Sequence, residues 1–210
     1  MNLPTESGSL ELQPHSKLLV HQIHEVAELF GFETRNKYEI LDESGRQVAW
    51  AAEQQKGFLG FLLRHFLGHW RSFTIQIFDA QRRPVILAKH PFRFFFQRLE
   101  IFDATGRPLG SIQQRFSILS KRFDVENERG MTLFEVASPI WRIWTFTFLH
   151  AGRPVATVAK KWTGALFELF TDKDKFLVDF SEGGLSESER KLILAAALFI
   201  DLQYFERKAN

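Results

Sequence analysis

The sequence contains no cysteine among its 210 residues. This absence excludes disulfides, thiolate zinc sites and cysteine nucleophiles, and it is typical of a protein from a reducing compartment. The net charge is only +2, which argues against nucleic acid as the main partner. We find no G-x-S-x-G, Walker or G-x-G-x-x-G motif, so the sequence predicts a protein that is not an enzyme and has no recognisable catalytic site.

Long apolar runs are missing as well. The uninterrupted run Leu192–Ile200 has nine apolar residues, whereas a membrane-spanning helix needs about 20. Ser186 and Glu189 have the spacing of a capping box, which predicts a helix that begins just before this run. A helix that is apolar on every face lies either inside a protein or inside a bilayer. We favour the protein interior. The first 17 residues have no basic segment followed by an apolar one, so we expect no secretory signal.

Phenylalanine is abundant, with 23 residues, and aromatic residues favour both strands and buried surfaces. Five times along the chain, a run in which apolar and polar residues alternate is followed by a turn and by a second run of the same kind. The turns are "DESGR", "DAQRRP", "DATGRP", "ENERG" and "HAGRP". Each unit predicts a β-hairpin, and further strands are expected within residues 161–170 and 176–180. So many strands favour a closed antiparallel barrel, because open edges promote aggregation. A barrel around the apolar C-terminal helix accommodates both patterns.

The N-terminal part has a different character. Residues 1–15 are polar and contain two prolines, so we expect a disordered lead-in before a single domain over residues 16–210. From Lys17 to Phe30, the apolar residues recur at steps of three and four, and Gly31 follows. This spacing predicts an amphipathic helix that packs on the barrel.

Three stretches carry a family resemblance. They are "LFGFETRNKYEILDESGRQVAWAAE" (Leu29–Glu53), "KKWTGALFELFTDKDKF" (Lys160–Phe176) and "ALFIDLQYFE" (Ala197–Glu206). In this order they resemble the phospholipid scramblase family, and the similarity extends over residues 18–206. The resemblance implies a Tubby C-terminal-like fold, in which twelve antiparallel strands surround a hydrophobic C-terminal helix.

The resemblance also implies a function. It predicts calcium-linked movement of phospholipids between the leaflets of a plasma membrane, by a protein that lies peripherally on its cytoplasmic side. The expected partner is a phospholipid membrane, and self-association, insertion of loops or extrusion of the last helix are the routes by which lipid movement would be achieved. The alternative is a soluble module that binds lipid headgroups or acts as an adaptor without transport.

Apolar stretches interrupt the strand pattern at residues 56–71, 90–98 and 138–146. Animal scramblases have cysteine clusters in the matching places, whereas this chain has Phe, Leu, Ile and Trp. Some of those cysteines are palmitoylated, and a palmitoyl chain and exposed aromatic side chains both provide apolar surface for a bilayer. The flanking basic residues suit anionic headgroups. The candidate membrane contacts are Phe58, Leu62, Phe66, Trp70, Phe94, Phe95, Phe96, Trp141, Trp144, Lys160 and Lys161. The alternative is that these stretches are strands whose aromatic side chains fill the barrel, and that Lys160 and Lys161 end an ordinary strand.

The segment "DKDKFLVDFSEG" (residues 172–183) matches the position of the family's proposed calcium loop. Calcium takes six to eight oxygen ligands, and the candidate ligands are Asp172, Asp174, Asp179 and Glu182. The alternative is a solvated acidic turn before a strand. Asp201 directly follows the apolar run, and we expect it to accept hydrogen bonds at the mouth of the barrel, because a buried carboxylate without partners is costly.

Overall fold

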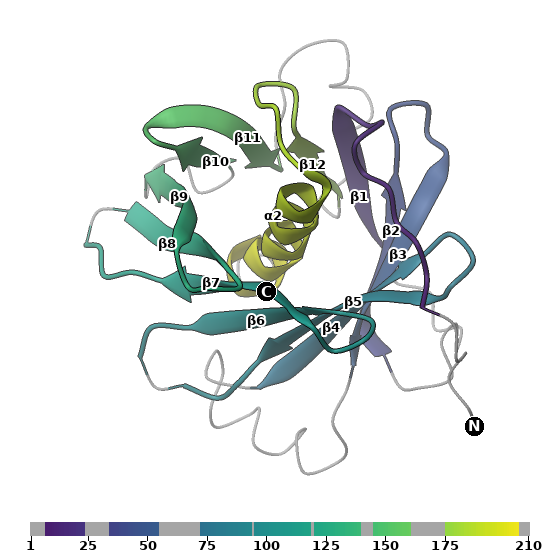
Figure 1. The fold of residues 1–210 in the computed structure, drawn as a ribbon, viewed down its shortest axis with the longest axis horizontal. Coiled ribbons are helices and arrows are strands. Elements are labelled where there is room, and N and C mark those ends of the chain that lie inside the picture. Colours follow the sequence, from purple (N-terminus) through teal and green to yellow (C-terminus); the bar gives the residue numbers. More distant parts are fainter. Residues whose placement is uncertain are drawn as a thin grey trace.

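A computed structural model describes residues 7–23, 34–54, 72–93, 95–118, 120–139, 145–160 and 175–205. Twelve antiparallel strands form a closed barrel in which every strand pairs with its neighbour in the sequence, and β1 pairs with β12 to close it. One α-helix, α2, occupies the centre of the ring of strands (Figure 1). The predicted fold class, a mainly β protein with a closed barrel around a C-terminal helix, is confirmed.

The strands are short and similar in length. They are β1 (Lys17–Ile23), β2 (Thr34–Leu41), β3 (Gln47–Gln54), β4 (Phe73–Asp79), β5 (Pro84–His90), β6 (Arg98–Asp103), β7 (Pro108–Gln114), β8 (Ser120–Asn127), β9 (Thr132–Pro139), β10 (Thr145–His150), β11 (Arg153–Ala159) and β12 (Lys175–Asp179). The five predicted hairpins are β2–β3, β4–β5, β6–β7, β8–β9 and β10–β11.

The helix predicted from Lys17 to Phe30 is wrong over its described part, because residues 17–23 form strand β1. Leu18, Val20 and Gln22 are buried, and the residues between them are partly exposed. This alternation is the two-residue period of a strand. The three- and four-residue spacing of the apolar residues favours a helix locally, but tertiary pairing overrides this preference. The segment must hydrogen-bond as strand β1 to both β2 and β12 to close the barrel. Residues 24–33 lie outside the described residues.

Residues 7–15, expected to belong to the disordered lead-in, pack against the barrel. Leu10 and Leu12 are part of the hydrophobic core. The backbone N–H of Leu12 donates to the carboxylate of Glu187 at 2.9 Å, and Arg190 donates from Nη1 to the carbonyls of Leu12 and His15. Two apolar side chains and these charge-assisted hydrogen bonds hold the segment on the first turns of α2.

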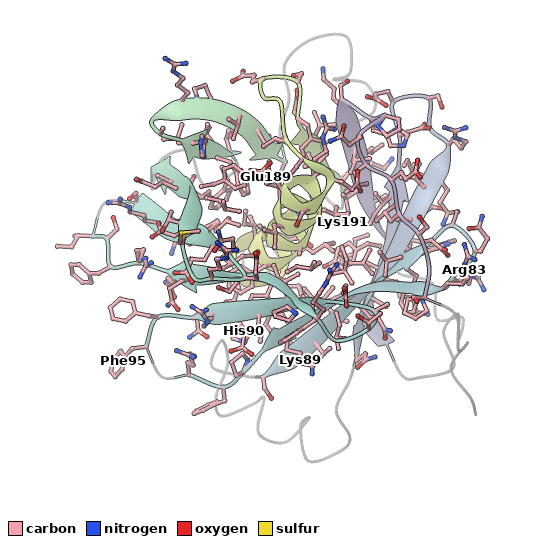
Figure 2. All side chains as sticks on the ribbon, viewed as in Figure 1. Arg83, Lys89, His90, Phe95, Glu189 and Lys191 are labelled. Carbon is pink, nitrogen blue, oxygen red and sulfur yellow. The ribbon has the colours of Figure 1, made fainter. Side chains whose placement is uncertain are left out.

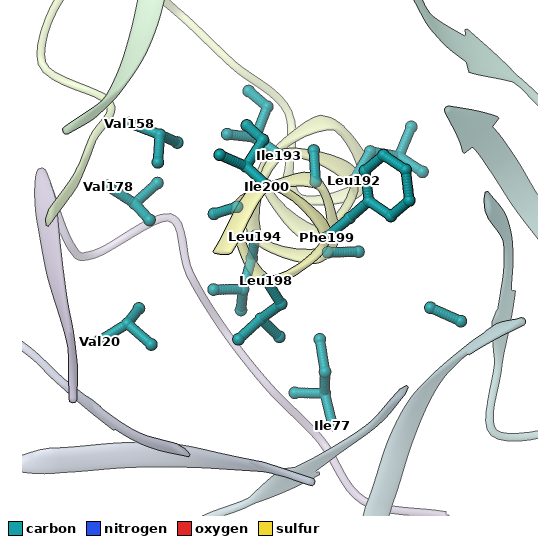
Figure 3. Packing of buried hydrophobic residues seen from close by; sticks show 14 of the residues in the cluster. Val20, Ile77, Val158, Val178, Leu192, Ile193, Leu194, Leu198, Phe199 and Ile200 are labelled. Carbon is teal, nitrogen blue, oxygen red and sulfur yellow. The ribbon is translucent and has the colours of Figure 1, made fainter. Parts of the chain in front are cut away.

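Helix α2 (Glu187–Ile200) begins as the sequence predicts. Ser186 is the N-cap, and it forms a capping box with Glu189. All nine residues of the apolar run are buried within the barrel, and Figure 3 shows the six large side chains of the run among strand residues such as Val20, Ile77 and Val178. Complete burial of a large aliphatic or aromatic side chain stabilises a fold by about 1.5–3 kcal/mol. The six large side chains of the run together therefore make the helix a main source of the barrel's stability.

A repeated turn explains the repeated sequence phrase. In three hairpin turns, an aspartate Oδ1 accepts hydrogen bonds from the backbone N–H groups two and four residues later, and Oδ2 accepts from the Nε of the arginine at that fourth position. The aspartates are Asp42, Asp79 and Asp103. In the β8–β9 turn, Asn127 Oδ1 accepts the two equivalent backbone bonds. The aspartate or asparagine therefore replaces the backbone partners that the turn residues would otherwise lack.

Asp42 makes one of these turns sensitive to acid. The pKa of its carboxyl group is lowered to about 2, mainly because the Ser44 hydroxyl donates to Oδ1 at 2.6 Å. Burial of the carboxyl opposes this effect, and the backbone N–H groups of Arg46 and Ser44 support it. Because the folded pKa is below the unfolded one, Asp42 stabilises the fold at pH values above the unfolded pKa of about 4, and this contribution is lost as the pH falls towards 2.

We predict that Asp42→Asn flattens the acid limb of the stability curve. The amide oxygen can keep the backbone bonds, as Asn127 does at the equivalent position, but it cannot titrate. Urea unfolding should be measured between pH 5 and pH 2, because the pKa of the Asp42 carboxyl group is about 4 in the unfolded chain and about 2 in the folded protein. Over this range the variant should lose less stability than the wild type. Equal losses in both proteins would contradict the assignment.

Candidate functional site

The two ends of the barrel differ in their connections. Because successive strands are antiparallel, the connections β2–β3, β4–β5, β6–β7, β8–β9 and β10–β11 all lie at one end, which we call the turn end. The connections β1–β2, β3–β4, β5–β6, β7–β8, β9–β10 and β11–β12 lie at the other, the loop end. The predicted apolar interruption at residues 90–98 belongs to the loop end. Residues 56–71 and 140–144, which contain the other two interruptions or most of them, lie outside the described residues.

Two described loops at the loop end carry exposed apolar side chains. In the β5–β6 loop, Phe95 is 81% exposed, and Phe92 and Phe96 are also exposed. In the β7–β8 loop, Phe116 and Ile118 are 73% and 76% exposed. We name these five residues the aromatic edge. Figure 2 shows Phe95 pointing away from the barrel. In this loop the structure favours exposed aromatic residues over strands that fill the barrel.

The two loops emerge side by side. Strands β6 and β7 are neighbours, and their pairing continues into the loops, where Gln114 N–H donates to Gln97 O at 2.8 Å and Gln97 N–H donates to Gln114 Oε1 at 3.0 Å. The β7–β8 pairing continues likewise from Arg115 N–H to Arg122 O at 2.9 Å. Phe96 and Phe116 are therefore attached to adjacent, hydrogen-bonded strand ends.

Basic residues flank the aromatic edge. Arg98 Nη1 lies 3.0 Å from Glu126 Oε2, and Arg115 forms ion pairs with both Asp124 (2.6 Å) and Glu126 (3.0 Å). Arg98 begins β6 and Arg115 follows β7 at the loop end, and their acidic partners lie on β8. Arg93 is exposed within the β5–β6 loop itself. The positive charges of the loops are thus partly fixed by acidic partners on the strands.

Several predicted membrane contacts fall outside the described residues. They are Phe58, Leu62, Phe66, Trp70, Phe94, Trp141, Trp144 and Lys161. Phe116 and Ile118, in contrast, are exposed but were not among the predicted contacts. The signal that could have found them is the arrangement of "RFSILSKR", in which apolar residues lie between basic ones where a strand pair is interrupted.

The inner side of the loop end carries a buried polar cluster. The hydroxyl of Tyr38 donates to Asp201 Oδ2 at 2.9 Å, and Lys160 Nζ lies 3.5 Å from Asp201 Oδ1. The side chains of Lys160 and Asp201 are only 12% and 2% exposed. Asp201 is the C-cap of α2, and Asp201–Phe205 continues as a single π-helical segment, η4. The predicted role of Asp201 as a hydrogen-bond acceptor at the barrel mouth is confirmed.

Lys160 compensates for an unfavourable charge. A carboxylate at a helix C-terminus is disfavoured by the helix dipole, and burial adds a desolvation penalty. The neighbouring ammonium group offsets both effects. For Lys160 to reach a lipid phosphate, as predicted, its side chain would have to leave Asp201.

The predicted calcium ligands are only partly described. Asp172 and Asp174 lie outside the described residues. Asp179 Oδ1 accepts hydrogen bonds from the Ser181 N–H and hydroxyl at 2.9 and 2.5 Å, and its Oδ2 lies 3.7 Å from Lys17 Nζ. Glu182 is exposed. Asp179 would therefore have to exchange its partners before it could bind a cation. Within the described ranges, no three acidic or histidine side chains are grouped as metal ligands.

None of the helices in the described part of the chain is long and apolar enough to cross a membrane.

The chain was compared with protein-family models, curated proteins and solved structures. A family model described as Scramblase matches residues 2–207. The chain is similar to phospholipid scramblase 2 of Bos taurus, with 32% identity over 90% of this chain and 68% of the relative. It is similar to phospholipid scramblase 1 of Mus musculus, with 31% identity over 92% of this chain and 62% of the relative. A solved structure from Arabidopsis thaliana matches with a TM-score of 0.48 and 11% identity, over 89% of this chain and 91% of that one.

The buried pair gives a testable prediction. Asp201→Asn and Lys160→Met should each destabilise the protein by about 3 kcal/mol, because each removes the partner of a buried charge. The double variant should be more stable than the sum of the two losses predicts, since neither charge is then present. Urea unfolding of the four proteins measures this coupling. The partly exposed pair Lys191–Glu187 provides the control: Lys191→Met should cost less than about 1 kcal/mol. Additive losses at Lys160 and Asp201 would contradict the pairing.

Proposed function

This chain belongs to the scramblase family, and from that premise we propose that it acts on phospholipids at a membrane surface while α2 stays inside the barrel. The observation that supports this proposal is the burial of Leu192–Ile200, in which no residue is more than 1% exposed. An apolar helix that is already covered by protein gains nothing from contact with lipid. Contact with the bilayer is then left to the outer surface and the loops.

Movement of lipid between leaflets is the second part of the proposal. A scramblase lowers the barrier that a polar headgroup meets in the hydrocarbon layer, and that barrier arises from the cost of desolvating polar groups. Loops that insert into one leaflet can perturb the bilayer locally without a membrane-spanning path. Calcium dependence and self-association are expectations from the family, and they enter the proposal as conditions to be tested.

The alternative is a module that binds phospholipid headgroups without moving them. The burial of Leu192–Ile200 also supports this alternative. Among the described residues, a barrel filled by its own helix offers no polar path for a headgroup. The two functions differ in a single measurable property, the rate at which lipid exchanges between leaflets.

The first prediction concerns that rate. Liposomes with a fluorescent lipid in both leaflets should lose more fluorescence to dithionite when the reconstituted protein is present than when it is absent, with parallel measurements in calcium and in a chelator. Rates equal to those of protein-free vesicles, together with binding in a flotation assay, would leave the headgroup-binding alternative. Failure to float with any phospholipid vesicle would contradict both.

The second prediction concerns the position of α2. Because the chain has no cysteine, Ala196→Cys introduces a single thiol at a fully buried position of the helix. This thiol should stay unreactive towards a maleimide both in solution and on vesicles. Met131→Cys, at an exposed position of the turn end, should react in both conditions. Reaction of the Ala196→Cys thiol only on vesicles would show that the helix leaves the barrel, against the proposal.

A further inference from the structure

We propose that the aromatic edge, formed by the adjacent β5–β6 and β7–β8 loops, is the surface that docks on anionic phospholipid bilayers. This inference rests on the proposed function, and it assigns the membrane contact to one edge of the loop end. It includes Phe116 and Ile118, which the sequence patterns did not indicate.

The distribution of exposed apolar side chains supports the assignment. Among the described residues, the exposed large hydrophobic side chains are Phe92, Phe95, Phe96, Phe116, Ile118 and Met131. Five of these six belong to the aromatic edge, and Met131 lies alone in the β8–β9 turn at the opposite end. Single exposed apolar residues are ordinary on protein surfaces, whereas a contiguous group marks an interaction site.

The backbone presents these side chains outward in a fixed arrangement. Gln97 Nε2 donates to Arg93 O at 3.2 Å, and Gln113 Nε2 donates to Phe96 O at 3.2 Å. These bonds tie the base of the β5–β6 loop to itself and to β7. Phe96 has a φ of 50°, in the left-handed region that non-glycine residues rarely adopt.

The charge pattern selects an anionic bilayer. Residues 90–98 and 114–122 contain Arg93, Arg98, Arg115, Lys121 and Arg122 and no acidic residue. Three of the five, Arg98, Arg115 and Arg122, form ion pairs with acidic residues of the strands, and Arg93 is exposed within the β5–β6 loop itself. Aromatic rings beside basic groups suit the boundary between acyl chains and headgroups, where the rings contact hydrocarbon and the cations meet lipid phosphates and carboxylates. A second copy of the same chain is a poorer partner, because a symmetric contact would bring two Arg93-bearing loops together with no acidic residue in either loop to meet them.

The experiment compares variants in vesicle flotation. Phe95→Ser/Phe116→Ser should lower the partition coefficient on vesicles that contain phosphatidylserine by about tenfold or more, because two phenyl rings no longer enter the bilayer. Met131→Ser, which removes an exposed apolar side chain at the other end, should bind as the wild type does. Since all three side chains are exposed, both variants should fold, and a thermal melt verifies this.

The charge contribution is tested separately. Arg93→Ser should weaken binding about fivefold on vesicles with phosphatidylserine, given about 1 kcal/mol per basic residue near an anionic surface, and it should have little effect on pure phosphatidylcholine. Added salt should weaken the binding of the wild type for the same reason.

Each outcome bears on one claim. If Phe95→Ser/Phe116→Ser binds vesicles as the wild type does, the aromatic edge is not the docking surface, although the proposed function stands. If this variant loses only self-association in sedimentation experiments, the edge is an interface between copies and the inference is overturned. If the wild type binds no vesicles at all, both the inference and the proposed function fail.

Discussion

The enclosure of α2 by the strands is the constraint on which the rest of the structure depends. Nine consecutive apolar residues need a surrounding of apolar side chains, and the inward-facing residues of the twelve strands provide it. Among the described residues, α2 provides most of the apolar surface on which the inward-facing strand residues pack, and the barrel interior needs such an occupant to reach native density. Helix and barrel are therefore one core, and neither is expected to be stable without the other.

The two ends of the barrel differ in how they enclose this shared core. At the turn end, compact hydrogen-bonded turns and the segment 7–15 close the barrel around the start of α2. At the loop end, Asp201 is held by Tyr38 and Lys160 where the helix ends, and long connections leave the strands. A rigid end and an end with exposed aromatic loops suit a protein that keeps its fold while one edge contacts a bilayer. Residues at the same end of the barrel thus have opposite roles, since Lys160 is buried against Asp201 and Phe95 is exposed.

The sequence was sufficient for features that depend on local chemistry. The hairpins follow from turn residues such as Asp42, and the start of α2 follows from Ser186 and Glu189, because these side chains bond to nearby backbone. It was insufficient where long-range pairing decides. Residues 17–23 become a strand only because β2 and β12 flank them. The sequence patterns also did not predict whether a given side chain at the loop end faces into the barrel or away from it. Composition alone does not tell that Lys160 is buried against Asp201 or that Phe116 is exposed.

The position of α2 after all twelve strands has a consequence for synthesis. A ribosome makes the chain from its N-terminus, so the eleven strands from β1 to β11 emerge before β12 can close the ring and before the central helix exists. Until then the inner faces of the nascent strands have nothing to pack on. The final topology is therefore reached only after translation of the helix, in a late cooperative step that joins the most distant parts of the chain. Nascent chains of this fold should accordingly rely on molecular chaperones until that step.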